Sequence, residues 1–133
     1  MRIRDIMHDI MRVPYDISVA SVVAVMDRKC TGSVLLEDRG EAVWIITERD
    51  VLRKVVAKNR NPMNVKALDI ASYPLITVGP EESLEEAARI MGENNIRRIL
   101  VRDGSKIIGK VTAGAITKNM RYIHAERILQ NRY

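Results

Sequence analysis

The chain contains the stretch VWIITERD at residues 43–50 and a related stretch, IGKVTAGA, at residues 108–115. Thr47 and Thr112 are 65 positions apart, and at the same offset Asp50 is replaced by Ala115. An apolar run that ends in a hydroxyl and is followed within one helical turn by a carboxylate suits a ligand with a phosphate and a ribose. Because only the first stretch has both groups, the sequence predicts a two-fold binding module with one complete pocket.

The same offset relates much of the remaining chain, which indicates two copies of one supersecondary unit. It pairs, without a gap, Val13 with Val78, Ser18 with Ser83, Val19 with Leu84, Met26 with Met91 and Asp38 with Asp103. We expect the first repeat in residues 1–66, with an N-terminal segment and a linker, and the second in residues 67–133, with an extended C-terminal helix. A unit of about 60 residues buries little surface by itself, so we expect the two repeats to share one core.

Hydrophobic patterning predicts the order β-α-β-β-α in the first repeat. Ser18 is suited to cap a helix whose apolar residues follow at helical spacing. Two strands, 34–36 and 42–47, flank a turn at residues 38–41. A helix over residues 48–58 is predicted to direct its apolar side chains inward, namely Val51, Leu52, Val55 and Val56. Pro62 follows at the end of the linker, since proline cannot continue a helix.

The second repeat shows the same order with clearer signals. Ser83 and Glu86 have the spacing of a capping box at the start of a helix. Strands are predicted at 98–101 and 106–111, and a final helix from Ala113 to about Gln130. Its apolar positions are Ile116, Met120, Ile123, Ile128 and Leu129. That stripe extends past the repeat, and either a partner chain or the helix's own domain would cover it.

Composition places the chain among ordinary globular proteins, with 47% hydrophobic and 29% charged residues. No apolar run is long enough to span a bilayer, and the first residues lack the apolar core of a signal peptide. The single cysteine, Cys30, cannot form an internal disulfide, which favours a reducing, cytoplasmic location. The net charge of +5 favours anionic partners or, alternatively, only solvates the surface.

These features together resemble a tandem pair of cystathionine-β-synthase (CBS) domains over essentially the whole chain. The resemblance rests on the two β-α-β-β-α repeats, on the phrase at residues 45–50, and on the preludes at residues 5–7 and 69–71. It implies a mixed α/β (α+β) fold in which two repeats pack with pseudo-two-fold symmetry as one module. It also implies two clefts for adenosyl compounds, namely AMP, ADP, ATP or S-adenosylmethionine, and pairing into a homodimer.

The first cleft contains side chains suited to each part of a nucleotide. Side chains alternate along a strand, so Ile45 and Thr47 share one face. The Thr47 hydroxyl can join the free amides of the helix start in holding a phosphate. The Asp50 carboxylate can accept the two ribose hydroxyls. The family pattern matches Thr47 to phosphate, Asp50 to ribose and Ile45 to the adenine wall. The structural alternative for Thr47 and Asp50 is an ordinary helix cap.

In the family, the other wall of this cleft comes from the second repeat. The residues that match it are Tyr73, Pro74 and Leu75, followed by Ile96, Arg97 and Arg98. Ile96 would flank the purine. Arg97 or Arg98 would contact phosphate oxygens and so favours a phosphorylated ligand over S-adenosylmethionine.

The second cleft lacks these groups. Lys110 replaces Ile45, Ala115 replaces Asp50, and Gly32 with Ser33 occupies the places of Arg97 and Arg98. Thr112 remains, and a threonine at a helix start has an ordinary capping role. We therefore expect one adenosyl ligand for each chain.

Neither a metal site nor a catalytic site is expected from the sequence. His8, His124 and Cys30 lack metal-ligand spacing, and no nucleophile lies beside an evident base. We interpret the chain as a regulatory module that senses adenine nucleotides and signals to an unidentified partner protein, without a catalytic cofactor and away from membranes. The alternative is a nucleic-acid-binding or scaffolding module that uses Arg121, Arg127 and Arg132 as a basic edge. Against it, aromatic residues make up only 4% of the chain.

Overall fold

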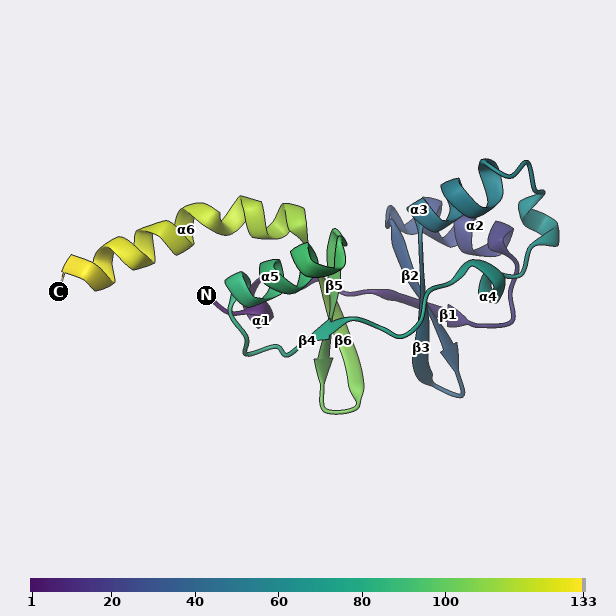
Figure 1. Cartoon of the computed structure of the whole chain (residues 1–133). Helices are drawn as coiled ribbons and strands as arrows, with labels where there is room; N and C mark the ends of the chain where they lie inside the picture. The colour runs from purple at the N-terminus through teal and green to yellow at the C-terminus, as the bar shows by residue number, and fades with distance from the viewer. Residues whose placement is uncertain (133) are drawn as a thin grey trace. The chain divides into compact units, whose positions relative to one another are not determined.

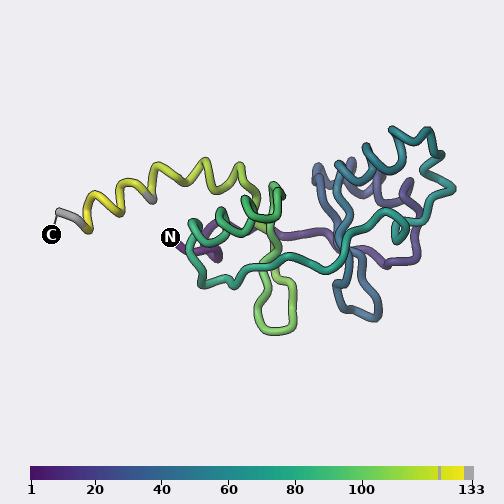
Figure 2. Tube along the Cα trace, viewed as in Figure 1, coloured from purple at the N-terminus to yellow at the C-terminus, as the bar shows by residue number. Residues whose placement is uncertain are grey.

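The computed structural model describes residues 1–132, except for the side chains of Ile123, Asn131 and Arg132 (Figures 1 and 2). The chain divides into two units, each with its own three-stranded sheet. We call Ile10–Leu75 the N-terminal unit, and Met1–Asp9 together with Ile76–Tyr133 the C-terminal unit.

The N-terminal unit contains the first β-α-β-β-α repeat. Its elements are β1 (Met11–Pro14), α2 (Val19–Lys29), β2 (Ser33–Asp38), β3 (Glu41–Thr47), α3 (Glu48–Val51), the π-helical turn η1 (Leu52–Val56), the 3-10 turn η2 (Pro62–Asn64) and α4 (Ala67–Ile70). The sheet has the order β1-β2-β3, with β1 parallel and β3 antiparallel to β2.

The C-terminal unit contains the second repeat and the start of the chain. Its elements are α1 (Ile3–Ile6), β4 (Thr77–Val78), α5 (Leu84–Asn94), β5 (Arg98–Asp103), β6 (Lys106–Thr112) and α6 (Ala113–Arg132). The sheet order β4-β5-β6 repeats that of the other unit, with one parallel and one antiparallel pairing. The predicted mixed α/β class and the duplicated strand and helix order are therefore confirmed.

Helices α2 and α5, one in each repeat, begin and end at corresponding residues. The Ser18 hydroxyl accepts the Ser21 amide at 3.1 Å, and the Ser83 hydroxyl accepts the Glu86 amide at 3.1 Å. The Glu86 side chain instead bonds to Arg89, which lowers the pKa of the Glu86 carboxyl. Cys30 and Asn95 end these helices with left-handed backbones, at φ values of 50° and 52°.

The short helices α1 and α4 each pack in the unit that does not contain the strand following them. Helix α1 precedes β1 in sequence, yet Ile3 and Ile6 join the core around β5 and β6. Helix α4 precedes β4, yet Ala67 and Ile70 join the core around β2 and β3. The buried side chains thus form two clusters, one in each unit, and not the single shared core expected from the sequence.

The helix predicted at residues 48–58 is shorter and changes its winding. After one α-helical turn, the Ala57 amide bonds to the Leu52 carbonyl at 2.9 Å, five residues back. This wider turn rotates the residues that follow. Val55 is buried as predicted, whereas Leu52 and Val56 are about 60% and 59% exposed, contrary to the prediction.

The final helix α6 continues well past the end of α5 (Figure 1). Ile116 is buried in the core, but Met120, Tyr122, Ile128 and Leu129 are exposed. The side chains of two residues singled out in the sequence, Ile123 and Arg132, lie outside the described part of the structure. Arg127 of the predicted basic edge forms an ion pair with Glu85 at 2.6 Å. Among residues 1–132, no helix combines the length and the apolar character needed to cross a membrane.

Candidate nucleotide site

The end of strand β3 directs its side chains alternately to the two faces of the sheet. Ile46 is fully buried and Trp44 packs against the same core. Ile45 and Thr47 therefore lie on the opposite face. Trp44 is further held by Tyr15, whose ring centroid lies 5.9 Å from its own. This bulky residue, which replaces the Gly109 of the second repeat, is thus directed toward the core.

Thr47 and Asp50 bond to each other reciprocally at the start of α3. The Asp50 amide donates to the Thr47 hydroxyl at 3.3 Å, and the Thr47 amide donates to Asp50 Oδ2 at 2.9 Å. The Thr47 hydroxyl also donates to Oδ2, at 3.1 Å. This is a capping box, so Thr47 and Asp50 do form the helix cap that the sequence offered as the alternative to ligand binding. We call Thr47, Asp50 and the intervening turn the β3–α3 junction.

Lys54 contacts the same carboxylate and was not identified from the sequence. Its ammonium lies 3.0 Å from Asp50 Oδ1 and donates to the Ile70 carbonyl at 2.9 Å. The Asp50 side chain is 13% exposed and the Lys54 side chain 46%, so the carboxylate is shielded from water while the ammonium stays accessible. The signal that could have revealed it is the i,i+4 spacing of Asp50 and Lys54 on one helix.

The predicted residues that follow α4 lie beside Ile45. The Ile45 amide donates to the Ser72 carbonyl at 3.1 Å, and the Ser72 amide donates back at 2.8 Å. Tyr73 and Pro74 follow immediately and are exposed, while Leu75 is half-buried. The structure therefore brings together Ile45, Thr47 and Asp50 with the segment 73–75 in one unit. Ser72, which fixes that segment, was not singled out from the sequence.

The other three predicted residues belong to the C-terminal unit. Ile96 packs against the core of that unit. The Arg97 carbonyl accepts the first amide of α6, from Ala113, at 2.8 Å, and Arg98 pairs with Thr112 across β5 and β6. Their role toward a nucleotide stays a prediction from the sequence.

The corresponding junction of the second repeat keeps the cap and lacks the charges. The Ala115 amide donates to the Thr112 hydroxyl at 3.1 Å. At the place of Lys54 stands Asn119, whose amide donates to the Ala115 carbonyl at 2.7 Å. Lys110 exchanges two backbone hydrogen bonds with His8, as Ile45 does with Ser72. The two junctions thus share one backbone plan and differ in their ionisable side chains.

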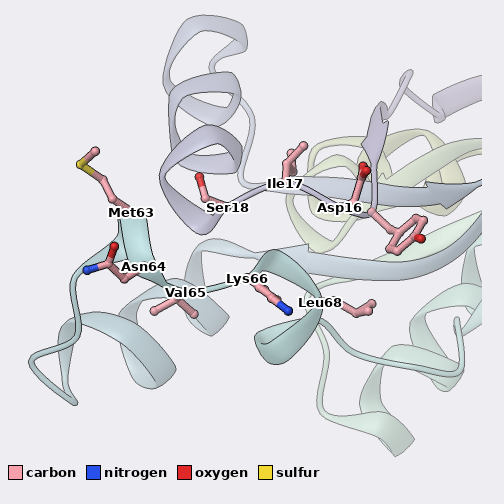
Figure 3. Close-up of a pocket in the computed structure, with 9 residues that line it drawn as sticks. Asp16, Ile17, Ser18, Met63, Asn64, Val65, Lys66 and Leu68 are labelled. Carbon is pink, nitrogen blue, oxygen red and sulfur yellow. The ribbon is translucent and has the colours of Figure 1, made fainter.

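A cavity of about 350 Å³ lies in the N-terminal unit (Figure 3). It lies between the segment before α2 and the segment before α4, which are joined by the Val19–Val65 and Ala67–Ile17 hydrogen bonds. Its lining is mostly apolar and contains none of the residues predicted to bind a nucleotide. No group of three metal-binding side chains was found in the described part of the chain.

Comparison with known proteins gives the chain its family. The family model described as "CBS domain" matches residues 3–57 and again residues 67–122. An uncharacterised protein of Methanopyrus kandleri is 41% identical over 93 residues, which cover 69% of this chain and 47% of that protein. The chain spans about half the length of the first curated relatives that it matches.

Solved structures with this fold support the assignment. A hexameric CBS-CP12 protein from bloom-forming cyanobacteria is 26% identical, with a TM-score of 0.85 over 93% of this chain and 73% of that one. A CBS domain protein of Pyrobaculum aerophilum, complexed with AMP, is 24% identical, with a TM-score of 0.78 over 86% of this chain and 89% of that one. The chain therefore belongs to the CBS domain family and contains two such domains in tandem.

Proposed function

We propose that this chain is a regulatory module that binds an adenine nucleotide at the β3–α3 junction and signals its presence to a partner protein. The supporting observation is the Asp50 carboxylate, which is held at a helix start beside the Ile45–Ser72 pairing. A carboxylate in this position can accept hydrogen bonds from two vicinal hydroxyls, and the amides of the helix start can donate to phosphate oxygens. The proposed contacts in this unit are Ile45, Thr47, Asp50, Tyr73, Pro74 and Leu75.

The capping box is compatible with this role because a carboxylate can accept more bonds than the cap uses. A carboxylate has about four lone-pair sites, and three donors contact Asp50: two from Thr47 and one from Lys54. A ribose would take the remaining site and displace the Thr47 hydroxyl, which is then released toward a phosphate. The cap therefore holds the carboxylate ready in its binding position before the ligand arrives.

The regulatory part of the proposal rests on the exposed apolar side chains of the helices. Leu52 and Val56 lie four residues apart and are both exposed. We propose that they pair with a second copy of the chain, so that a homodimer forms. A ligand could signal through such an assembly only by binding one packing arrangement more tightly than another. The AMP complex of the Pyrobaculum aerophilum protein indicates that this fold can hold such a ligand.

Calorimetric titration of the chain with AMP, ADP, ATP, S-adenosylmethionine and NADH tests the proposal. We expect AMP to bind the wild type, and Asp50→Asn to weaken binding by roughly tenfold or more, since charged hydrogen bonds to both ribose hydroxyls are lost. Asp69→Asn, an exposed carboxylate elsewhere in the unit, serves as the matched control and should bind normally. If none of the five compounds binds the wild type, the proposal is wrong. Steeply salt-dependent binding of RNA or DNA would support the nucleic-acid alternative instead.

A further inference from the structure

We propose that Lys54 is a specificity-determining residue that makes the β3–α3 junction prefer a phosphorylated nucleoside to an uncharged one. This inference rests on the proposed function and concerns the chemistry of the same site. Lys54 is not among the nucleotide contacts predicted from the sequence.

The position of the Lys54 ammonium is fixed from two sides. It contacts Asp50 Oδ1 at 3.0 Å and donates to the Ile70 carbonyl at 2.9 Å. Ile70 ends α4, two residues before the Ser72 that pairs with Ile45. Lys54 thus joins the helix that carries Asp50 to the segment that leads to Tyr73 and Pro74.

The positive charge of Lys54 offsets the repulsion between the Asp50 carboxylate and a ligand phosphate. A carboxylate suited to a ribose repels the phosphate of the same ligand, because both are anionic and only a few ångströms apart. An ammonium 3.0 Å from Asp50 neutralises that repulsion while it leaves the carboxylate able to accept hydroxyls. A lysine has three N–H donors, and the two contacts above use two of them, so one donor remains for a phosphate oxygen.

The second repeat provides an internal comparison. Both members of the ion pair are replaced there, Asp50 by Ala115 and Lys54 by Asn119. The Asn119 amide bonds to the Ala115 carbonyl at 2.7 Å, which closes the helix turn without any charge. The lysine is present at the junction that has the carboxylate and absent from the one that lacks it. This is the distribution expected if Lys54 acts together with Asp50.

The decisive measurement is the ratio of the affinities for AMP and adenosine. Lys54→Gln is expected to lower the AMP affinity by about three- to tenfold and to change the adenosine affinity by less than about twofold, since two charges near a protein surface interact at that scale. Lys54→Arg should retain the preference. Arg53→Gln is the matched control, because it removes the same charge from the neighbouring exposed position and should leave the ratio unchanged.

Several outcomes would overturn the inference. An equal loss for AMP and adenosine in Lys54→Gln would show that Lys54 only supports the structure. An unchanged ratio, or an equal change in Arg53→Gln, would show that its contact with Asp50 is irrelevant to selectivity. Lys54→Met, which keeps the aliphatic stem, replaces Lys54→Gln if that variant does not fold. If the wild type binds neither compound, the proposed function itself fails; if it binds both equally, only the present inference fails.

Discussion

Gly109 on β6 lies directly against the backbone of His8, so that a Cβ atom at position 109 would come within 2.7 Å of the His8 carbonyl oxygen. That oxygen accepts the Lys110 amide at 2.8 Å, and the Lys110 carbonyl accepts the His8 amide at 2.9 Å. The glycine is therefore required by this close approach of two backbones.

We predict that Gly109→Ala lowers the free energy of unfolding by about 1–3 kcal/mol, because the methyl group must displace the His8 segment and break its hydrogen bonds. Gly92→Ala is the control, since its added methyl group would meet no atom within 4 Å and α5 is helical there. That change should stabilise by about 0.5–1 kcal/mol. Denaturant unfolding measures both, and equal effects would contradict the prediction.

Removing the capping hydroxyl from either junction should lower the stability of the protein, but only its removal from the first junction should weaken AMP binding. We expect Thr47→Val and Thr112→Val each to lower the free energy of unfolding by about 1–2 kcal/mol, because each hydroxyl accepts a helix amide. Thr47→Val should also weaken AMP binding by about tenfold, whereas Thr112→Val should leave it unchanged. Thermal melts combined with calorimetric titration check this. An equal loss of AMP affinity in the two variants would contradict the assignment of the site to Thr47.

Ile3 is expected to stabilise the sheet β4-β5-β6, and Ile70 the sheet β1-β2-β3. Both are almost fully buried, so substitution by alanine should cost about 2–5 kcal/mol. In Ile3→Ala, hydrogen exchange should quicken at Val101 and Val111, which share its core, more than at Leu36. Ile70→Ala should show the reverse pattern. Faster exchange confined to β1–β3 in Ile3→Ala would contradict the observed packing of α1.

The sequence was sufficient for the features that depend on local pattern. The strand and helix order follows from apolar periodicity, and the starts at Ser18 and Ser83 follow from capping chemistry. The turn at Arg39 and Gly40 was also expected, and both residues have the positive φ of a two-residue hairpin. The grouping of Ile45, Thr47 and Asp50 likewise reflects their spacing across a strand end and the first helical turn.

The remaining features depend on tertiary contacts that no local pattern encodes. Nothing near Ile3 or Ile70 in sequence indicates which sheet each will cover. Leu52 and Val56 are exposed in a π-helical turn, an arrangement that a strict 3.6-residue period does not predict. Lys54 could have been found by its spacing from Asp50, but its bond to Ile70 depends on where α4 packs.

Leu52→Glu should weaken self-association of the chain. Leu52 and Val56 form an exposed apolar pair, and a carboxylate placed in a dimer interface is costly to desolvate. We expect the dimer dissociation constant to rise by about tenfold or more in light scattering coupled to size exclusion. Met63→Glu is the control, because Met63 is also exposed but lies on the separate turn η2. A wild type that stays monomeric at every concentration would show that these residues do not mediate dimerisation.

The difference between the two junctions predicts one adenine nucleotide for each chain. Asp50 is held as an acceptor beside Lys54, whereas the second junction has Ala115, which has no carboxylate, and Asn119, whose side chain bonds to the Ala115 carbonyl. A ribose at the second junction would lose both charged hydrogen bonds, which corresponds to a weakening of about tenfold or more. Calorimetric titration with AMP should therefore saturate at one ligand per chain, and Asp50→Asn should abolish most of that signal. Two equivalent sites in the wild type would contradict the prediction, because they would mean that the ion pair at the first junction does not determine where the nucleotide binds.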